Sequence, residues 1–136
     1  MSTLKSLIML TFSLFATAVF ADDISQQALL KALNTPKNNI VILDVRSVEE
    51  YNNGHLANAI NISHNTVADK LNQLEQYKDN TVVVYCRSGR RAGFAENILT
   101  ENGFTKVRHL DGDMNGWLEA NLPVVINNIH SNNKKL

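Results

Sequence analysis

Residues 81–99 read TVVVYCRSGRRAGFAENIL and contain the only cysteine of the 136-residue chain. The run 81–85 is mostly apolar and β-branched, which is typical of a strand buried on both faces of a parallel sheet. Residues 91–102 have the spacing of an amphipathic helix, and Gly103 follows as its expected C′ residue. This order predicts a strand that turns directly into a helix, with Cys86 at the junction.

The rest of the chain from residue 22 repeats this alternation of strands and helices. The segments with such a pattern are, in order, a helix at 25–33, a strand at 40–43, a helical turn at 47–51, a strand at 59–62, a helix at 66–76, a strand at 106–110 and a last short helix with Met114, Trp117 and Leu118. Ser25 and Asn65 are the expected N-caps. Alternating strands and helices form right-handed βαβ units, so the predicted fold class is α/β, an open parallel sheet flanked by helices on both faces.

The first 21 residues have the composition of a secretory signal peptide. Lys5 is the only charge before Asp22, residues 6–20 are almost entirely apolar, and Val19-Phe20-Ala21 forms a small-residue cleavage site. An uncleaved membrane anchor is the alternative, but the segment is shorter than the roughly 20 apolar residues that a spanning helix needs. We therefore expect cleavage before Asp22 and export of the remainder.

The exported part is expected to be one small domain, residues 22–126, followed by a polar, asparagine-rich and flexible tail at 127–136. Basic and acidic residues each number 13, and the loss of Lys5 leaves a single excess negative charge. This balance gives no indication of a nucleic-acid partner. No later segment is apolar enough to hold the domain in a membrane after cleavage.

Cys86 is predicted to lie at the carboxyl edge of the sheet, where open α/β sheets bind their ligands. The next residues, Arg-Ser-Gly-Arg-Arg at 87–91, must turn into a helix within a few positions. Such a turn directs N–H groups toward its centre, the helix adds its positive end, and Gly89 supplies conformational freedom. The helix end and the guanidinium groups favour a thiolate, which predicts a reactive cysteine in an anion-binding cradle. The alternative is a buried, inert thiol beside solvated arginines.

Three segments together resemble the rhodanese family of sulfurtransferases. Residues 86–91, CRSGRR, resemble its active-site loop, and residues 43–62, LDVRSVEEYNNGHLANAINI, resemble its upstream signature. Residues 110–117, LDGDMNGW, resemble its downstream signature, which Pro123-Val124 follows. The usual Gly-Gly of that signature is Gly112-Asp113 here, a departure that concerns local turn geometry. With the predicted signal peptide, the chain is similar to the small single-domain periplasmic rhodaneses of bacteria, of the phage-shock type.

The resemblance implies a rhodanese-like fold and a sulfurtransferase activity. In that family the loop cysteine, here Cys86, takes a sulfane sulfur from a donor such as thiosulfate and becomes a persulfide. It then passes the sulfur to cyanide or a thiol acceptor. The resemblance also implies a periplasmic location, neither metal nor organic cofactor, and a small anionic donor as substrate, and it leaves open a partner protein as sulfur acceptor.

The residues that follow Cys86 are the expected donor-binding residues. Arg91 closes the loop and is expected to line the pocket, and Arg87 is expected to meet the anion at its rim. Arg90 either does the same or faces solvent. The backbone N–H groups of Ser88 and Gly89 are expected to contribute, and the Ser88 hydroxyl either donates as well or serves the turn.

Three other polar residues of the upstream signature are not assigned to chemistry. Asp44 follows a predicted strand and is interpreted as a turn or cap residue. Arg46 is expected to pair with a neighbouring carboxylate, and His55 is interpreted as structural.

Two other functions use a reactive cysteine. A cysteine phosphatase or arsenate reductase also binds an anion around a thiolate, but it spaces the pair as Cys-x5-Arg, whereas Arg91 gives Cys-x4-Arg and Ala92 follows it. The shorter loop favours transfer of a single sulfur. A persulfide carrier or redox-sensing module that serves one protein partner is the other alternative, and the sequence leaves it open.

Overall fold

The structure, a computed structural model, describes residues 22–127. The predicted signal peptide at 1–21 and the predicted tail residues 128–136 lie outside the described residues. Asn127, the first residue of the expected tail, lies within them, and its amide N–H donates to the carbonyl of Asn52 at 2.9 Å. Among the helices of residues 22–127, none is long and apolar enough to cross a membrane.

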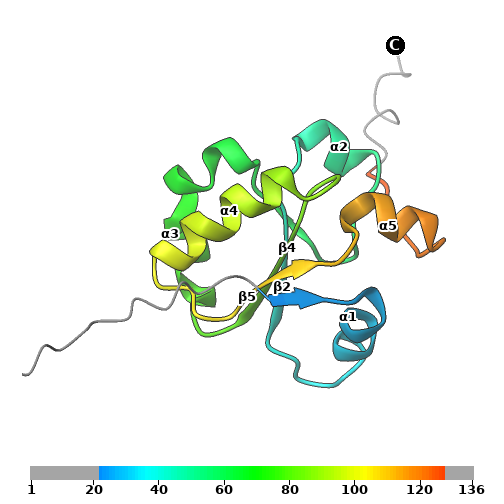
Figure 1. Cartoon of the computed structure of the whole chain (residues 1–136), viewed down its shortest axis with the longest axis horizontal. Coiled ribbons are helices and arrows are strands. Elements are labelled where there is room, and N and C mark those ends of the chain that lie inside the picture. The colour runs from blue at the N-terminus through cyan, green and yellow to red at the C-terminus, as the bar shows by residue number, and fades with distance from the viewer. Residues whose placement is uncertain (1–21, 128–136) are drawn as a thin grey trace, which may run out of the picture.

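A parallel sheet of five strands forms the centre of the described domain (Figure 1). The strands are β1 (Asp22–Ile24), β2 (Ile40–Asp44), β3 (Ile60–Asn61), β4 (Thr81–Tyr85) and β5 (Val107–Leu110), in the spatial order β1-β5-β4-β2-β3. All neighbouring strands pair in parallel. The two apolar runs of the sequence, β2 and β4, lie side by side at the centre, as expected for strands buried on both faces.

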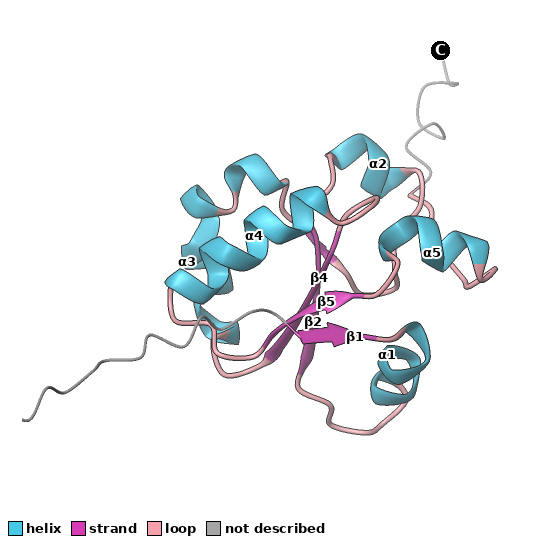
Figure 2. Ribbon diagram, in the orientation of Figure 1, coloured by secondary structure: helices cyan, strands magenta, loops and turns pink. Residues whose placement is uncertain are grey.

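Helices cover both faces of this sheet (Figure 2). They are α1 (Gln26–Leu33), α2 (Val48–Asn52), α3 (Leu71–Leu74), α4 (Arg90–Glu101) and α5 (Asp113–Glu119). Successive side chains of β4 alternate between two apolar clusters: Val82 and Val84 pack with residues of α3 and α4, whereas Val83 and Tyr85 pack with residues of α1 and α5. The predicted α/β fold class, a parallel sheet flanked on both faces, is confirmed.

The single helix predicted over 66–76 is wrong. The segment consists of 3₁₀ turns at His64–Thr66, Ala68–Lys70 and Glu75–Tyr77 around the one-turn helix α3, and no side chain caps the first of these turns. Short polar side chains compete for the backbone here, since the Thr66 hydroxyl donates to the Ser63 carbonyl at 3.0 Å. Val67 and Leu74 are nevertheless fully buried, and Leu71 packs partly buried against the same cluster, so the apolar side chains of the segment still face the core.

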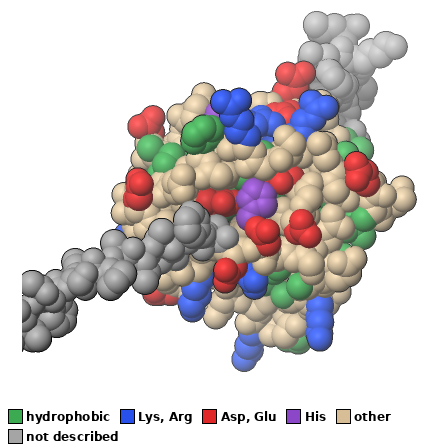
Figure 3. All heavy atoms as spheres, in the orientation of Figure 1, with side chains coloured by type: hydrophobic (Ala, Val, Ile, Leu, Met, Phe, Trp, Pro, Cys, Tyr) green, Lys and Arg blue, Asp and Glu red, His purple; other side chains and the backbone are tan. Residues whose placement is uncertain are grey.

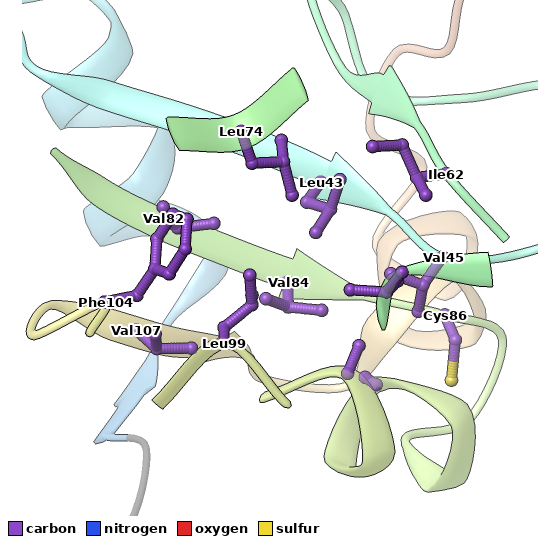
Figure 4. Packing of buried hydrophobic residues seen from close by; sticks show 13 residues of the cluster. Leu43, Val45, Ile62, Leu74, Val82, Val84, Cys86, Leu99, Phe104 and Val107 are labelled. Carbon is purple, nitrogen blue, oxygen red and sulfur yellow. The ribbon is translucent and has the colours of Figure 1, made fainter. Parts of the chain in front are cut away.

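The cluster under α4 anchors the start of the loop that follows β4. Leu43, Val84, Leu99 and Phe104 pack together on this face of the sheet (Figure 4). Cys86 belongs to the same cluster and is only 1% exposed, but its sulfur points away from Val45 and Val84 (Figure 4). The backbone of Cys86 is therefore fixed by the core, while its sulfur lies at the edge of that core.

The packing of α4 gives a prediction for stability. Leu99→Ala should lower the free energy of unfolding by about 2–5 kcal/mol, because Leu99 is fully buried and its loss leaves a cavity. Phe94→Ala, on the exposed side of the same helix, should change it by about 0.5 kcal/mol or less. Urea unfolding of both variants measures this. Equal losses would contradict the orientation of α4.

Candidate active site

Cys86 follows β4 directly, and residues 87–89 connect it to α4. Gly89 is the N-cap of α4 with a φ of 111°, a left-handed conformation that favours glycine. Its amide N–H donates to the Cys86 sulfur at 3.0 Å. A Cβ atom at this position would also lie 3.2 Å from Oδ2 of Asp113. Glycine is thus required both by the turn and by the close approach of the carboxylate.

The first turn of α5 holds the start of this loop. The Cys86 amide N–H donates to Oδ1 of Asp113 at 2.9 Å. In return, the N–H groups of Met114 and Asn115 donate to the carbonyls of Cys86 and Arg87 at 3.0 and 3.1 Å. These three hydrogen bonds fix the backbone on both sides of the Cys86 side chain.

Arg91 forms an ion pair that connects the loop to α2. Its guanidinium donates to both carboxylate oxygens of Glu50, at 2.7 and 2.9 Å, and both side chains are partly buried. The hydrogen bond from Arg91 is the main reason that the pKa of Glu50 falls to about 2. Glu50 also raises the pKa of Arg91, and the neighbouring Cys86 sulfur contributes in the same direction. Arg91 therefore lies close to the sulfur with its orientation fixed by a carboxylate.

The other predicted donor-binding residues lie around the mouth of the loop. Arg87, Ser88 and Arg90 are exposed, and Gly89 is half-buried. Arg87 also lines a hollow of about 320 Å³, together with Arg46, Glu50, Asn53, Gly54, Met114, Asn115, Leu118 and Val124. The structure thus places Gly89 and Arg91 beside the Cys86 sulfur, with Arg87 and Ser88 on neighbouring hollows and Arg90 exposed. The roles of all five residues in binding a donor stay predictions.

The upstream polar residues form a buried network, as their interpretation as structural residues requires. Arg46 and Asp44 form an ion pair at 2.6 Å, which confirms the expected carboxylate partner of Arg46. The Tyr85 hydroxyl donates to the same Asp44 oxygen at 2.6 Å, and Arg46 also donates to the Gly54 carbonyl at 2.7 Å. His55 stacks on Tyr51 with ring centroids 3.6 Å apart. These contacts hold the segment before and after α2 against the ends of β2 and β4.

Three charged residues behind the loop were not expected from the sequence. Asp113 uses its second oxygen, Oδ2, to bind Nε2 of His109 at 2.9 Å, and Nδ1 of His109 is hydrogen-bonded to Glu96. Asp113 first and Glu96 second raise the pKa of His109 to about 10, against the opposing effect of burial, so the imidazole is protonated at neutral pH. Asp23 and Asp111 line the hollow beside His109 as further acidic groups.

Asp113 and Glu50, which the sequence patterns did not mark as site residues, each leave a signal in the sequence. Asp113 stands where the resembled signature has glycine, and the hydrogen bonds of its side chain show that this departure concerns more than local turn geometry. Ser47 and Glu50 have the spacing of a capping box, which α2 indeed contains. No local pattern indicates that Glu50 pairs with Arg91, because the two residues are 41 positions apart.

The ion pairs of His109 predict a pH dependence of stability. The folded-state pKa of about 10 lies above the ordinary value of 6.5, so the stabilisation is complete below pH 6.5 and is lost as the pH rises toward 10. The free energy of unfolding should therefore fall over this range, and His109→Gln should flatten the decline. His64→Gln, in the first 3₁₀ turn, is the control. Urea unfolding at several pH values measures the slope, and an unchanged slope in His109→Gln would contradict the assignment.

Comparison with known proteins agrees with this geometry. The Rhodanese-like domain family matches residues 25–120. The uncharacterized protein YibN of Escherichia coli (strain K12) is 34% identical over 90 residues, covering 65% of this chain and 63% of YibN, so this chain spans somewhat less than two thirds of that relative. Thiosulfate sulfurtransferase PspE of the same strain is 40% identical over 70 residues, covering 52% of this chain and 67% of PspE.

A solved structure shares the fold. The crystal structure of a rhodanese-related protein from Thermoplasma volcanium has a TM-score of 0.68 and 28% identity, covering 77% of this chain and 98% of that chain. The family match includes four of the five described strands, all except β1, and the whole Cys86 loop. The chain therefore belongs to the rhodanese-like domain family.

Proposed function

We propose that this protein is a sulfurtransferase that carries sulfane sulfur on Cys86, from an anionic donor such as thiosulfate to cyanide or a thiol. The observation that carries the proposal is the position of the Cys86 sulfur, which accepts the Gly89 N–H at the N-terminus of α4. A helix N-terminus stabilises negative charge, and both a thiolate and a persulfide are anions. The similarity to the thiosulfate sulfurtransferase PspE supports the same chemistry.

The proposed reaction has two displacement steps. The Cys86 thiolate attacks the outer sulfur of thiosulfate, the S–S bond of the donor breaks, and sulfite leaves with the bonding electron pair. The new S–S bond makes a Cys86 persulfide that bears the negative charge. Cyanide or a thiolate then attacks the outer sulfur, takes it away and returns Cys86 to the thiolate. The cycle needs no external oxidant or reductant.

The cations around the loop have different proposed parts in this reaction. Arg91 is held by Glu50, so its guanidinium is already oriented beside the sulfur before a donor arrives. Arg87 is exposed and lines the adjacent hollow, where an incoming dianion would meet it first. Arg90 is exposed at the first position of α4 and is the third candidate.

The location of the protein is part of this proposal. The composition of residues 1–21 supports export and cleavage before Asp22, and hence work in the periplasm. A mature chain that begins at Asp22 would start with β1, whose Asp22 pairs with Arg108 of β5. A persulfide carrier that serves one protein remains the alternative, and turnover with thiosulfate and cyanide separates it from an enzyme that uses small molecules.

The sulfur-carrying role gives the first prediction for this site. After incubation with thiosulfate, the intact protein should gain the mass of one sulfur atom, and cyanide should remove it with release of thiocyanate. Cys86→Ser should do neither, because a hydroxyl has a much higher pKa than a thiol and forms no persulfide, yet its similar size preserves the fold. The same intact mass reports whether residues 1–21 have been removed.

The control for this experiment is wild-type protein whose single cysteine has been alkylated with iodoacetamide. It should also remain free of the sulfur adduct. Full transferase activity in Cys86→Ser, or alkylation of Cys86 only after unfolding, would establish that the thiol is an inert part of the core.

The arginines give a second prediction. Arg91→Ala should raise the KM for thiosulfate about tenfold or more, which is the cost of losing a hydrogen bond to a charged group. Arg87→Ala should also raise the KM, and Arg90→Ala should have the mildest effect because that side chain is exposed and lines neither of the two hollows beside the loop. Steady-state kinetics with each variant measure this. Negligible changes at all three positions would mean that the backbone N–H groups alone bind the donor.

A further inference from the structure

The side chain of Asp113 contacts the backbone of Cys86, the candidate catalytic residue. One carboxylate oxygen accepts the Cys86 N–H at 2.9 Å, and the other binds His109 at 2.9 Å. The second oxygen also lies against Gly89, within 3.2 Å of where a Cβ would be. Gly89 is the residue whose N–H binds the Cys86 sulfur. Asp113 therefore touches both residues that determine where this sulfur lies.

The backbone of Asp113 shows that its side chain is needed at this place. Its φ of 52° is in the left-handed region, where glycine is favoured and an L side chain is strained. Asp113 is nevertheless only 3% exposed, and both of its oxygens are hydrogen-bonded. A residue that served the turn alone would gain by being glycine. The contacts of the carboxylate offset the strain.

His109 balances the negative charge that Asp113 brings near the sulfur. A carboxylate beside a thiolate would disfavour the thiolate through like-charge repulsion. His109, protonated between Asp113 and Glu96, supplies a positive charge directly behind Asp113. Acidic side chains gather around a histidine on the face formed by β1 and β5 (Figure 3), where Asp23, His109, Asp111 and Asp113 line a hollow with Ser88 and Gly89. Arg91 of α4 is a further cation near the sulfur.

We propose that Asp113 is a positioning residue for Cys86, and that His109, which binds the other oxygen of Asp113, compensates the charge of this carboxylate behind the loop. This inference rests on the proposed sulfur transfer for its meaning in catalysis. Asp113 does not touch the substrate. It fixes the Cys86 amide, which orients the sulfur toward the Gly89 N–H, and the positive charge of His109 weakens the repulsion between the Asp113 carboxylate and the thiolate or persulfide.

The experiment compares two replacements of Asp113. Asp113→Gly relieves the backbone and removes the acceptor, whereas Asp113→Asn keeps an oxygen that can accept the Cys86 N–H. Asp113→Gly should speed hydrogen exchange at the Cys86 amide about tenfold or more and slow single-turnover persulfide formation by a similar factor, with the thiosulfate KM little changed. Asp113→Asn should keep both rates within about threefold of wild type.

The matched control is Asn121→Gly, which places glycine at another left-handed position, with a φ of 54°, at the far end of α5. It should change neither rate. If Asp113→Gly exchanged the Cys86 amide and formed the persulfide at wild-type rates, Asp113 would be a turn residue only, and the proposal would be overturned. If Asp113→Gly and Asp113→Asn changed both rates equally, the hydrogen bond from the Cys86 N–H would not be the cause of the positioning, and the proposal would be overturned.

His109→Gln tests the charge, since glutamine can still donate to Asp113 but carries no positive charge. The pH midpoint of Cys86 alkylation by iodoacetamide should move upward in this variant, and an unmoved midpoint would overturn the compensating role of His109. Exchange and alkylation do not depend on sulfur transfer. If wild-type protein forms no persulfide while these two readouts respond as expected, the proposed function fails and the positioning role stands.

Discussion

The attachment of the carboxyl end of β4 to the first turn of α5 is the constraint on which the candidate site depends. Cys86 and Arg87 exchange three hydrogen bonds with residues 113–115, so the chain leaves the sheet in one defined direction. The apolar cluster under α4 fixes the same backbone from the other side. Because the backbone on both sides of the Cys86 side chain is held in this way, the Cys86 sulfur lies at the edge of the core and accepts the Gly89 N–H. The fold thus positions a nearly buried thiol at a helix N-terminus.

The ionisable groups around this thiol are arranged in pairs. Arg46 is bound to Asp44 in the buried network, Arg91 is bound to Glu50 at the surface of the loop, and His109 lies between Glu96 and Asp113. Such pairing holds each charge in one orientation, which matters more for a site than the small stability that partly exposed ion pairs provide. The positive character of the loop therefore comes from the helix end and its N–H groups as well as from arginines. The partners of each pair are residues of the protein itself, so the proposed donor would meet groups that are already oriented.

The sequence predicted those features that local patterns encode. The apolar runs gave β2 and β4, and the strand–turn–helix order gave the Cys86 loop with Gly89 at its left-handed position. The pattern missed β1, an edge strand in which only Ile24 is buried and whose pairing with β5 spans the chain. The apolar spacing also predicted one helix at 66–76, where the structure has 3₁₀ turns around α3, because the same apolar side chains are buried in either conformation. The partners of Asp113 and Glu50 depend on tertiary packing, which no local spacing records.

A crystal structure of thiosulfate-treated protein would test the central claim most directly, since that claim concerns where the transferred sulfur lies. The account predicts a second sulfur bonded to the Cys86 sulfur and pointing into the loop, within hydrogen-bond distance of backbone N–H groups at residues 89–91. The Arg91–Glu50 pair and the Cys86–Asp113 hydrogen bond should be unchanged. The account would be contradicted by an unmodified Cys86. It would also be contradicted by a persulfide in a structure where the loop has separated from α5 and the Cys86–Asp113 hydrogen bond is broken.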